Sequence, residues 1–152
     1  MPVDRPHDSL PEKDFNPDKL HLLLRVTFAA DRSAVEPAVG QVMAVVRGMK
    51  GINGKEDAIE LSLQEALANA VIHGAKEDAS KTVECIVSGD DEQGVLIVVR
   101  DPGTGFDPAS IPVCTIGENL FSNHGRGIFL INQLMDKVWF HRNGTEIHMV
   151  KR

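Results

Sequence analysis

The pattern of hydrophobic and polar positions predicts a strand and two helices in the first half of the chain. Residues 20–29 (LHLLLRVTFA) are rich in Leu, Val, Thr and Phe, a composition typical of strands. Apolar residues three and four positions apart then predict a helix that ends near Met49 and is capped by Asp31 or Ser33. After a turn-rich break, residues 55–73 predict a longer helix.

The longer helix is expected to be apolar on two sides and therefore largely buried, with Gly74 as its C-terminal cap. One stripe comprises Ile59, Leu63, Ala66, Leu67 and Ala70, and the other comprises Leu61, Ala68 and Ile72. Glu65, Asn69 and His73 fall in one row between the stripes. Two interpretations of this row stay open. The helix alone favours polar side chains on a surface or in a structural hydrogen bond, and the alternative is a row that faces a polar ligand in a cleft.

The second half of the chain predicts four strands, one long loop and one helix. The segments, in order, are strands 82–88 and 95–100, loop 101–124, helix 125–134, and strands 137–142 and 146–150 around the hairpin dipeptide Asn143-Gly144. Strands that pair through hairpins beside a few helices indicate an α+β fold. We expect a two-layer sandwich, in which about three helices cover one face of a mainly antiparallel mixed sheet. The loop is longer than ordinary connections, which is typical of lids and binding loops.

Length and charge argue against several classes of function. The chain has 152 residues, and we expect a flexible N-terminal arm over residues 1–17 and a single domain over residues 18–152. Lys and Arg total 16 against 22 Asp and Glu, and the resulting net charge of −6 disfavours direct nucleic-acid binding. No apolar run approaches the roughly 20 residues of a membrane span, and no secretory signal is visible, so we expect a cytoplasmic protein without membrane contact. Cys85 is expected in the core, and no metal or redox motif includes it or Cys114.

Two glycine pairs are the strongest chemical signals among the 13 glycines. Gly103 and Gly105 follow Asp101 at the end of an apolar strand, in DPGTGF. Glycine lets a ligand approach the backbone, and the aspartate could accept a hydrogen bond from an exocyclic amine. Gly125 and Gly127 open an apolar helix in HGRGIFLI, where free N–H groups suit a phosphate. Each pair alone also fits a plain turn or a helix start without a ligand.

The combination of motifs is more specific than its parts. In order, the chain carries EALANAVIHG, DPGTGF, HGRGIFLI and NGTEIHM. These segments resemble the N-box, the two glycine boxes and the closing Gly-Thr segment of the GHKL ATPase superfamily, whose nucleotide-binding domain is the Bergerat fold. The resemblance extends over about residues 20–151. Within the superfamily, it is nearest to bacterial anti-sigma factors that are also serine-protein kinases.

The resemblance implies ATP and Mg²⁺ as cofactors and assigns roles to individual residues. Asn69 would hold Mg²⁺, and Glu65 would act as the general base. Asp101 would bind the adenine amine, with Thr145 helping through water. The other residues implied at the nucleotide are His73, Gly103, Gly105, Phe106, Gly125, Arg126, Gly127 and Ile128. For His73, packing or hydrogen bonding beneath the site is favoured over metal ligation, and residues 111–123 would form the ATP lid.

The resemblance further implies an ATP-dependent serine/threonine-protein kinase that phosphorylates a small antagonist protein in a partner-switching pathway. A second partner would be a sigma factor or the target of another such pathway, and a homodimer is an option because the family often dimerises. One departure supports an alternative: kinase relatives often carry a basic residue late in the lid, where this chain reads ENLFSNH and the nearest full positive charge is Arg126. The alternative is an ATP-binding module that captures partners with little or no phosphoryl transfer. A weaker third option is that no nucleotide binds.

Overall fold

The computed structural model describes residues 15–104 and 123–152. Most of the expected N-terminal arm and most of the long loop therefore lie outside the described residues. The elements, in chain order, are β1 (His21–Ala29), α1 (Val35–Val46), α2 (Glu56–Asn69), β2 (Thr82–Asp90), β3 (Gly94–Arg100), α3 (Asn123–Leu134), β4 (Lys137–His141) and β5 (Glu146–Lys151). This order agrees with the order predicted from the hydrophobic pattern.

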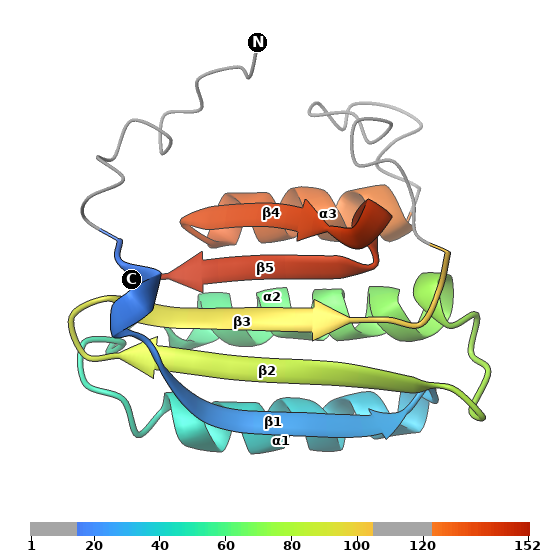
Figure 1. Ribbon diagram of the computed structural model, residues 1–152, viewed down its shortest axis with the longest axis horizontal. Coiled ribbons are helices and arrows are strands. Elements are labelled where there is room, and N and C mark those ends of the chain that lie inside the picture. Colours follow the sequence, from blue (N-terminus) through green and yellow to red (C-terminus); the bar gives the residue numbers. More distant parts are fainter. Residues whose placement is uncertain (1–14, 105–122) are drawn as a thin grey trace, which may run out of the picture.

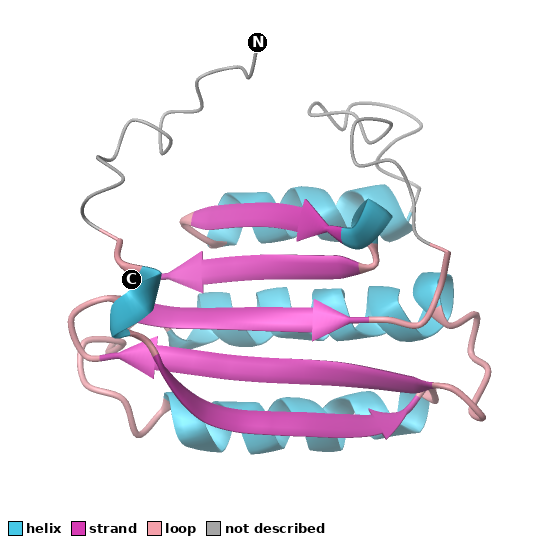
Figure 2. Ribbon diagram, in the orientation of Figure 1, coloured by secondary structure: helices cyan, strands magenta, loops and turns pink. Residues whose placement is uncertain are grey.

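The five strands form one sheet in the order β1-β2-β3-β5-β4 (Figure 1). All four neighbouring pairs are antiparallel. The three helices lie in a second layer on one face of the sheet (Figure 2), so the predicted α+β two-layer fold is confirmed. The described strands contain no parallel pair, in contrast to the expected mixed sheet. The reason is that β5 inserts between β3 and β4, which point the same way, and separates them (Figure 1).

The core lies between the sheet and the helical layer. Burial alternates along β2, where Val83, Cys85 and Val87 are fully buried, as expected for a strand with one covered face. The helices supply the other half of the core, with Val42, Met43, Ile59, Leu63, Leu67 and Ile131 all fully buried. Cys85 is a core residue as predicted, and burial raises the pKa of its thiol to about 12. It is therefore protonated and unreactive at neutral pH.

The predicted Asp31 cap is present, but it caps a 3-10 turn before α1, whose own N-cap residue Ala34 makes no side-chain capping hydrogen bond. The Asp31 carboxylate accepts a hydrogen bond of 2.9 Å from the Ser33 backbone N–H. A short 3-10 turn, Arg32–Ala34, follows this cap and leads into α1. Capping by Asp31 satisfies a donor that the first helical turn would otherwise leave unpaired.

Two expectations for the second helix are wrong. The first apolar stripe is buried, but Leu61 in the second stripe is 39% exposed. The outer side of α2 is not covered by another layer, so the helix is buried on one side only. Gly74 is not a left-handed cap either, because α2 continues into a π-helical turn, Ala70–Gly74, and then into Ala75 with φ −91°.

The last hairpin has a more irregular turn than the Asn143-Gly144 dipeptide alone predicts. Arg142, Asn143 and Gly144 all have positive φ, at 51°, 56° and 85°. Trp139 in β4 lies on the open face of the sheet, stacked on His148 at 5.2 Å between ring centroids. In the part of the chain that the structure describes, no helix is long and apolar enough to cross a membrane.

Candidate functional site

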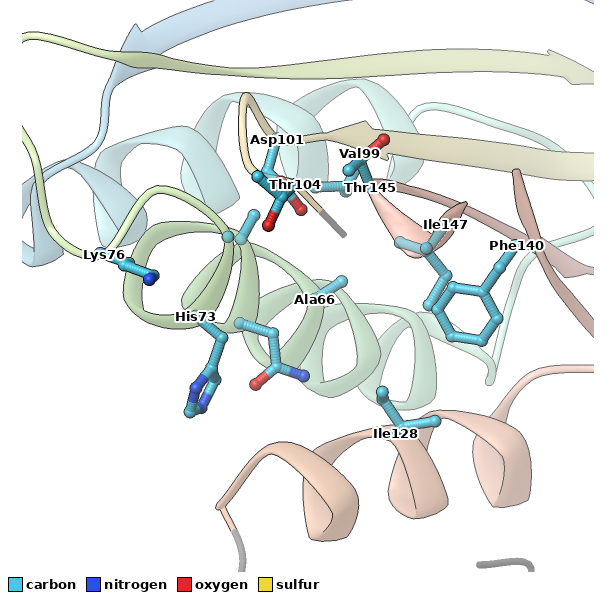
Figure 3. Close-up of a pocket in the computed structure, with 14 residues that line it drawn as sticks. Ala66, His73, Lys76, Val99, Asp101, Thr104, Ile128, Phe140, Thr145 and Ile147 are labelled. Carbon is cyan, nitrogen blue, oxygen red and sulfur yellow. The ribbon is translucent and has the colours of Figure 1, made fainter. Parts of the chain in front are cut away.

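A pocket of about 280 Å³ opens between the helical layer and one end of the sheet (Figure 3). It is bounded by the end of α2 and its π turn, the end of β3, the β4–β5 turn and the start of α3. Five residues that the resemblance implies at the nucleotide or the ion line it: Asn69, His73, Asp101, Ile128 and Thr145. The structure therefore gathers into one place residues that are spread over 77 positions of the chain (145 minus 69, plus one).

Asp101 is held rigidly at the end of β3. Its backbone N–H donates a hydrogen bond of 2.9 Å to the Thr145 carbonyl, and its Oδ1 accepts one of 2.8 Å from the Gly103 N–H. Burial raises the pKa of the Asp101 carboxyl, and the Gly103 hydrogen bond opposes this rise. Within the described part of the chain, Oδ2 has no hydrogen-bond partner, so it can accept a hydrogen bond from a ligand.

Positions 74 and 103 require glycine because the chain segments around Asp101 approach one another closely. A methyl group added to Gly74 would lie 2.3 Å from Asp101 Cγ and 2.5 Å from Oδ2. A methyl group added to Gly103 would lie 2.3 Å from the Gly74 carbonyl oxygen and 2.9 Å from Asp101 Oδ1. The requirement for glycine at position 74 is therefore steric and comes from another part of the chain, which is why a cap was the wrong prediction.

Thr145 presents a second acceptor to the pocket. Its Oγ1–H donates to the Arg142 carbonyl at 2.8 Å, so the lone pairs of the hydroxyl oxygen stay available. The apolar residues that line the pocket beside it include Val99, Phe140 and Ile147. A flat ligand with N–H donors fits this combination of apolar walls and two acceptors.

Glu65 and Asn69 face the beginning of α3. A methyl group added to Gly127, which is buried, would lie 2.7 Å from Glu65 Oε2 and 3.1 Å from Asn69 Nδ2. The absence of a side chain at Gly127 thus lets α3 cross α2 at this carboxylate and amide. Asn69 also lines the pocket, whereas Glu65 is half-buried just beyond the lining residues.

A match to a known family supports these observations. Residues 28–151 match the histidine kinase-like ATPase domain. The chain belongs to this family. The resemblance of its motifs to the GHKL superfamily is thereby confirmed.

Individual relatives are named serine-protein kinase RsbW. Those of Staphylococcus aureus strains MSSA476, MW2 and JH9 are each 34% identical over 103 residues, which is 63% of this chain. The chain spans 64% of the length of these relatives.

The other residues predicted for the ATPase site differ in where they lie. Ile128 is 5% exposed and lines the pocket. Gly125 is half-buried and Arg126 is exposed in the first part of α3, and neither is among the lining residues. His73 was expected beneath the site, but it is exposed at the rim, because the chain widens into a π turn directly after Asn69. Gly105 and Phe106 lie outside the described residues, as does most of the expected lid.

The donor set near Asn69 fits a magnesium ion that binds together with a nucleotide. No group of three His, Cys, Asp or Glu side chains suited to a metal occurs among residues 15–104 and 123–152. An ion here would therefore take the Asn69 amide oxygen with phosphate oxygens and water, which is a common arrangement for Mg²⁺. The space that a Cβ at Gly127 would fill, beside both Glu65 and Asn69, keeps this position open.

One pocket residue was missed at the sequence level. Lys76 lines the pocket and is exposed, with a positive φ of 53°. A lysine two residues after the end of the N-box carries no motif signal, and only the path of the backbone places it at the pocket.

Proposed function

We propose that the protein is an ATP-dependent serine/threonine-protein kinase of the anti-sigma type, which phosphorylates a small antagonist protein in a partner-switching pathway. The observation that carries this proposal is the approach of Gly127 to both Glu65 and Asn69 at a pocket that also contains Asp101. Transfer of a phosphoryl group from a bound nucleotide would use these three features together: a carboxylate, an amide and the start of a helix. Membership of an ATPase family and the likeness to named serine-protein kinases support it.

The adenine base would bind between the end of β3 and the helical layer. Asp101 Oδ2 would accept a hydrogen bond from the exocyclic amine, since Oδ1 already accepts one from Gly103. The Thr145 hydroxyl oxygen would accept from a water that bridges to the base. Gly103 would act through Asp101, because a side chain at position 103 would meet the Gly74 carbonyl and Asp101. Gly105 and Phe106 are also proposed to lie at the nucleotide.

The triphosphate would extend toward the start of α3. Asn69 would hold Mg²⁺, and the Gly125 N–H lies in the first turn of α3, where N–H groups are free and carry partial positive charge. Because α3 begins at Asn123, the N–H of Gly127 falls one position beyond these free donors, and Gly127 contributes by lacking a side chain. When bound, Mg²⁺ neutralises negative charge on the phosphate oxygens. Arg126, in the same turn, adds a full positive charge. These local groups would let a chain with a net charge of −6 hold a polyanion.

Glu65 would act as the general base toward the protein substrate. Its carboxylate would accept the proton of a serine hydroxyl while that oxygen forms a bond to the γ-phosphorus. The bond between the γ-phosphorus and the bridging oxygen breaks in the same step, and ADP leaves with that electron pair. Glu65 lies one helical turn before Asn69, which supports a base beside the proposed ion.

The direct test is transfer of label from [γ-³²P]ATP to an antagonist protein encoded by a neighbouring gene. We expect label on one serine or threonine of the antagonist, located by mass spectrometry, and only when Mg²⁺ is present. A chain that binds Mg-ATP and forms a complex with the antagonist, yet leaves it unlabelled, would contradict the kinase assignment.

That contrary result would instead favour a nucleotide-dependent module that captures a partner. The sequence feature behind this alternative is the absence of Lys and Arg from residues 118–124. Calorimetry separates the two, because the module would bind ATP and its partner tightly without turnover. In either case we propose a cytoplasmic protein with a sigma factor or a similar regulator as second partner, no contact with nucleic acid or membrane, and the capacity to form a homodimer.

A further inference from the structure

We propose that Lys76 is a nucleotide-binding residue whose ammonium group contacts a phosphate of the bound nucleotide. This inference rests on the proposed function, since it concerns the same pocket. Lys76 is the only lysine or arginine among the described residues that line the pocket, and it is exposed. Figure 3 shows Lys76 on the same side of the pocket as His73, away from Thr145 and Ile147.

An unusual backbone conformation places this lysine at the pocket. Lys76 and Glu77 are consecutive non-glycine residues with positive φ, at 53° and 57°. Left-handed backbone costs free energy for an L-residue with a side chain, so two in succession persist only where the surrounding structure enforces them. Such strain is commonly found at binding sites.

Contacts on the inner side of the segment enforce the conformation. Ala75 is fully buried, and its N–H donates to the Ala70 carbonyl at 2.8 Å. The Glu77 N–H donates to the Val71 carbonyl at 2.8 Å. Both hydrogen bonds tie the segment to the π turn that carries His73 and Gly74. The backbone around Lys76 is therefore fixed relative to the pocket.

Of the two residues with positive φ, the acidic one is in an ion pair and the basic one is not. Glu77 forms an ion pair with Arg32, in which Arg32 Nη2 donates to Glu77 Oε2 at 3.3 Å and a shorter bond joins Nε to Oε1. Glu77, the acidic neighbour, is thus paired with Arg32, while Lys76 forms no ion pair within the described part of the chain. The net effect is a positive group at the rim of a pocket in an acidic protein.

The chemistry of the ligand decides what Lys76 contacts. Adenine and ribose are neutral, and Asp101 and Thr145 supply only acceptors to the base. An ammonium group prefers an anionic oxygen, and the phosphates are the only anionic part of ATP. The four-carbon side chain of lysine allows the ammonium to reach them from the rim.

The experiment compares the affinities of Mg-ATP, Mg-ADP and adenosine for the unaltered chain and three variants by calorimetry or NMR titration. Lys76→Ala keeps a Cβ, so it keeps the left-handed strain and removes only the charged side chain. Lys76→Arg restores the charge. Lys81→Ala is the matched control, because Lys81 is exposed on the same connection and does not line the pocket.

We expect Lys76→Ala to weaken ATP and ADP binding about tenfold and adenosine binding less than twofold. Lys76→Arg should recover most of the loss, Lys81→Ala should bind like the unaltered chain, and added salt should narrow the difference caused by Lys76→Ala. Equal weakening for adenosine, or no weakening at all, would overturn the inference alone. Failure of the unaltered chain to bind any of the three ligands would overturn the proposed function and this inference together.

Discussion

The two ends of the pocket, called the base end and the phosphate end after the parts of ATP that we propose bind there, are built in different ways. At the base end, Asp101, Gly103 and Gly74 come from a strand end, a loop and a helical turn that are locked by hydrogen bonds and by backbone approach. At the phosphate end, Glu65 and Asn69 lie where two helices cross at Gly127. The base end is thus anchored at the end of a strand, whereas the phosphate end depends on the packing of α3 on α2.

This difference indicates how much each end can adjust. A methyl group at Gly103 would collide with the Gly74 backbone, which cannot move without moving the π turn. A methyl group at Gly127 would meet only the ends of the Glu65 and Asn69 side chains, which can rotate away. The base end is preformed, and the phosphate end can change by side-chain movement. The predictions below separate the two ends, from the largest effect to the smallest.

The largest effect is expected at the phosphate end, on transfer alone. Glu65→Gln should slow phosphoryl transfer by about 10²–10⁴-fold, because the amide cannot accept the serine proton. ATP affinity and the midpoint of thermal unfolding should stay close to those of the unaltered chain, since Gln has nearly the same shape. Rapid-quench assays with [γ-³²P]ATP measure the rate.

Glu60→Gln is the matched control for this variant. Glu60 lies on the same helix and pairs with Arg47 at 3.2 Å, away from the pocket. It should leave the transfer rate unchanged. An equal loss in both variants, or no loss in Glu65→Gln, would remove Glu65 from the role of general base.

Methyl groups added at the two ends should differ in how much they lower stability. Gly103→Ala should lower the free energy of unfolding by about 2–3 kcal/mol and weaken adenosine binding, because the clash is with backbone. Gly127→Ala should change stability by less than about 1 kcal/mol, since alanine is the better helix former and the displaced side chains are flexible. Its transfer rate should still fall, because Glu65 must move.

Urea unfolding and adenosine titration of both variants test this contrast. If Gly127→Ala is destabilised as strongly as Gly103→Ala, the phosphate end is as rigid as the base end. The proposed difference between the ends would then be wrong.

Asp101→Asn should lower the affinity for the base without lowering the stability of the fold. The side-chain oxygen of Asn can still accept from the Gly103 N–H, but the NH₂ group in place of Oδ2 cannot accept from the adenine amine. We expect adenosine and ATP affinity to fall at least about tenfold, which corresponds to ~1.4 kcal/mol. Stability without ligand should be equal or higher, because a partly buried charge is removed. Unaltered affinity in titrations of this variant would exclude Asp101 as the base contact.

The smallest effect is the pH dependence that follows from the raised pKa of Asp101. Adenosine affinity should decline on acidification, beginning at a pH above the ordinary aspartate value of 3.8, because the protonated carboxyl no longer accepts two hydrogen bonds. The effect on folding has the opposite sign. Since the folded-state pKa is raised, protonation of Asp101 favours the unliganded fold, and this contribution is lost as the pH rises through that pKa.

Titration of adenosine at several pH values measures the decline, with Asp101→Asn as the control. The variant should show a flat profile over the same range. A profile in the unaltered chain that is equally flat would contradict the assignment of Asp101 to the base.

The elements that follow from local pattern were predictable from the sequence. The element order, the Asp31 cap and the buried stripe of α2 depend on residues close together in the chain, so their periodicity is visible without the fold. Asp101 and Asn69 were singled out because they lie in motifs with fixed spacing, and both line one pocket.

The features that the sequence did not reveal depend on contacts between distant segments. The need for glycine at position 74 comes from Asp101, which lies 27 residues later in the chain. The exposure of Leu61 reflects the absence of a third layer over α2 in the described structure. The place of Lys76 depends on two residues in left-handed conformation, which no residue type at positions 76 and 77 predicts.

Binding of Mg-ATP and of adenosine to Asn69→Ala and Asp101→Asn, measured side by side by calorimetry, tests the two-ended pocket most directly. Asp101→Asn should weaken both ligands by a similar factor, because both carry the base. Asn69→Ala should weaken ATP, abolish the contribution of Mg²⁺ and leave adenosine binding unchanged. If both variants weaken both ligands equally, or if neither variant affects ATP, the base and the phosphates do not bind at the two ends assigned to them.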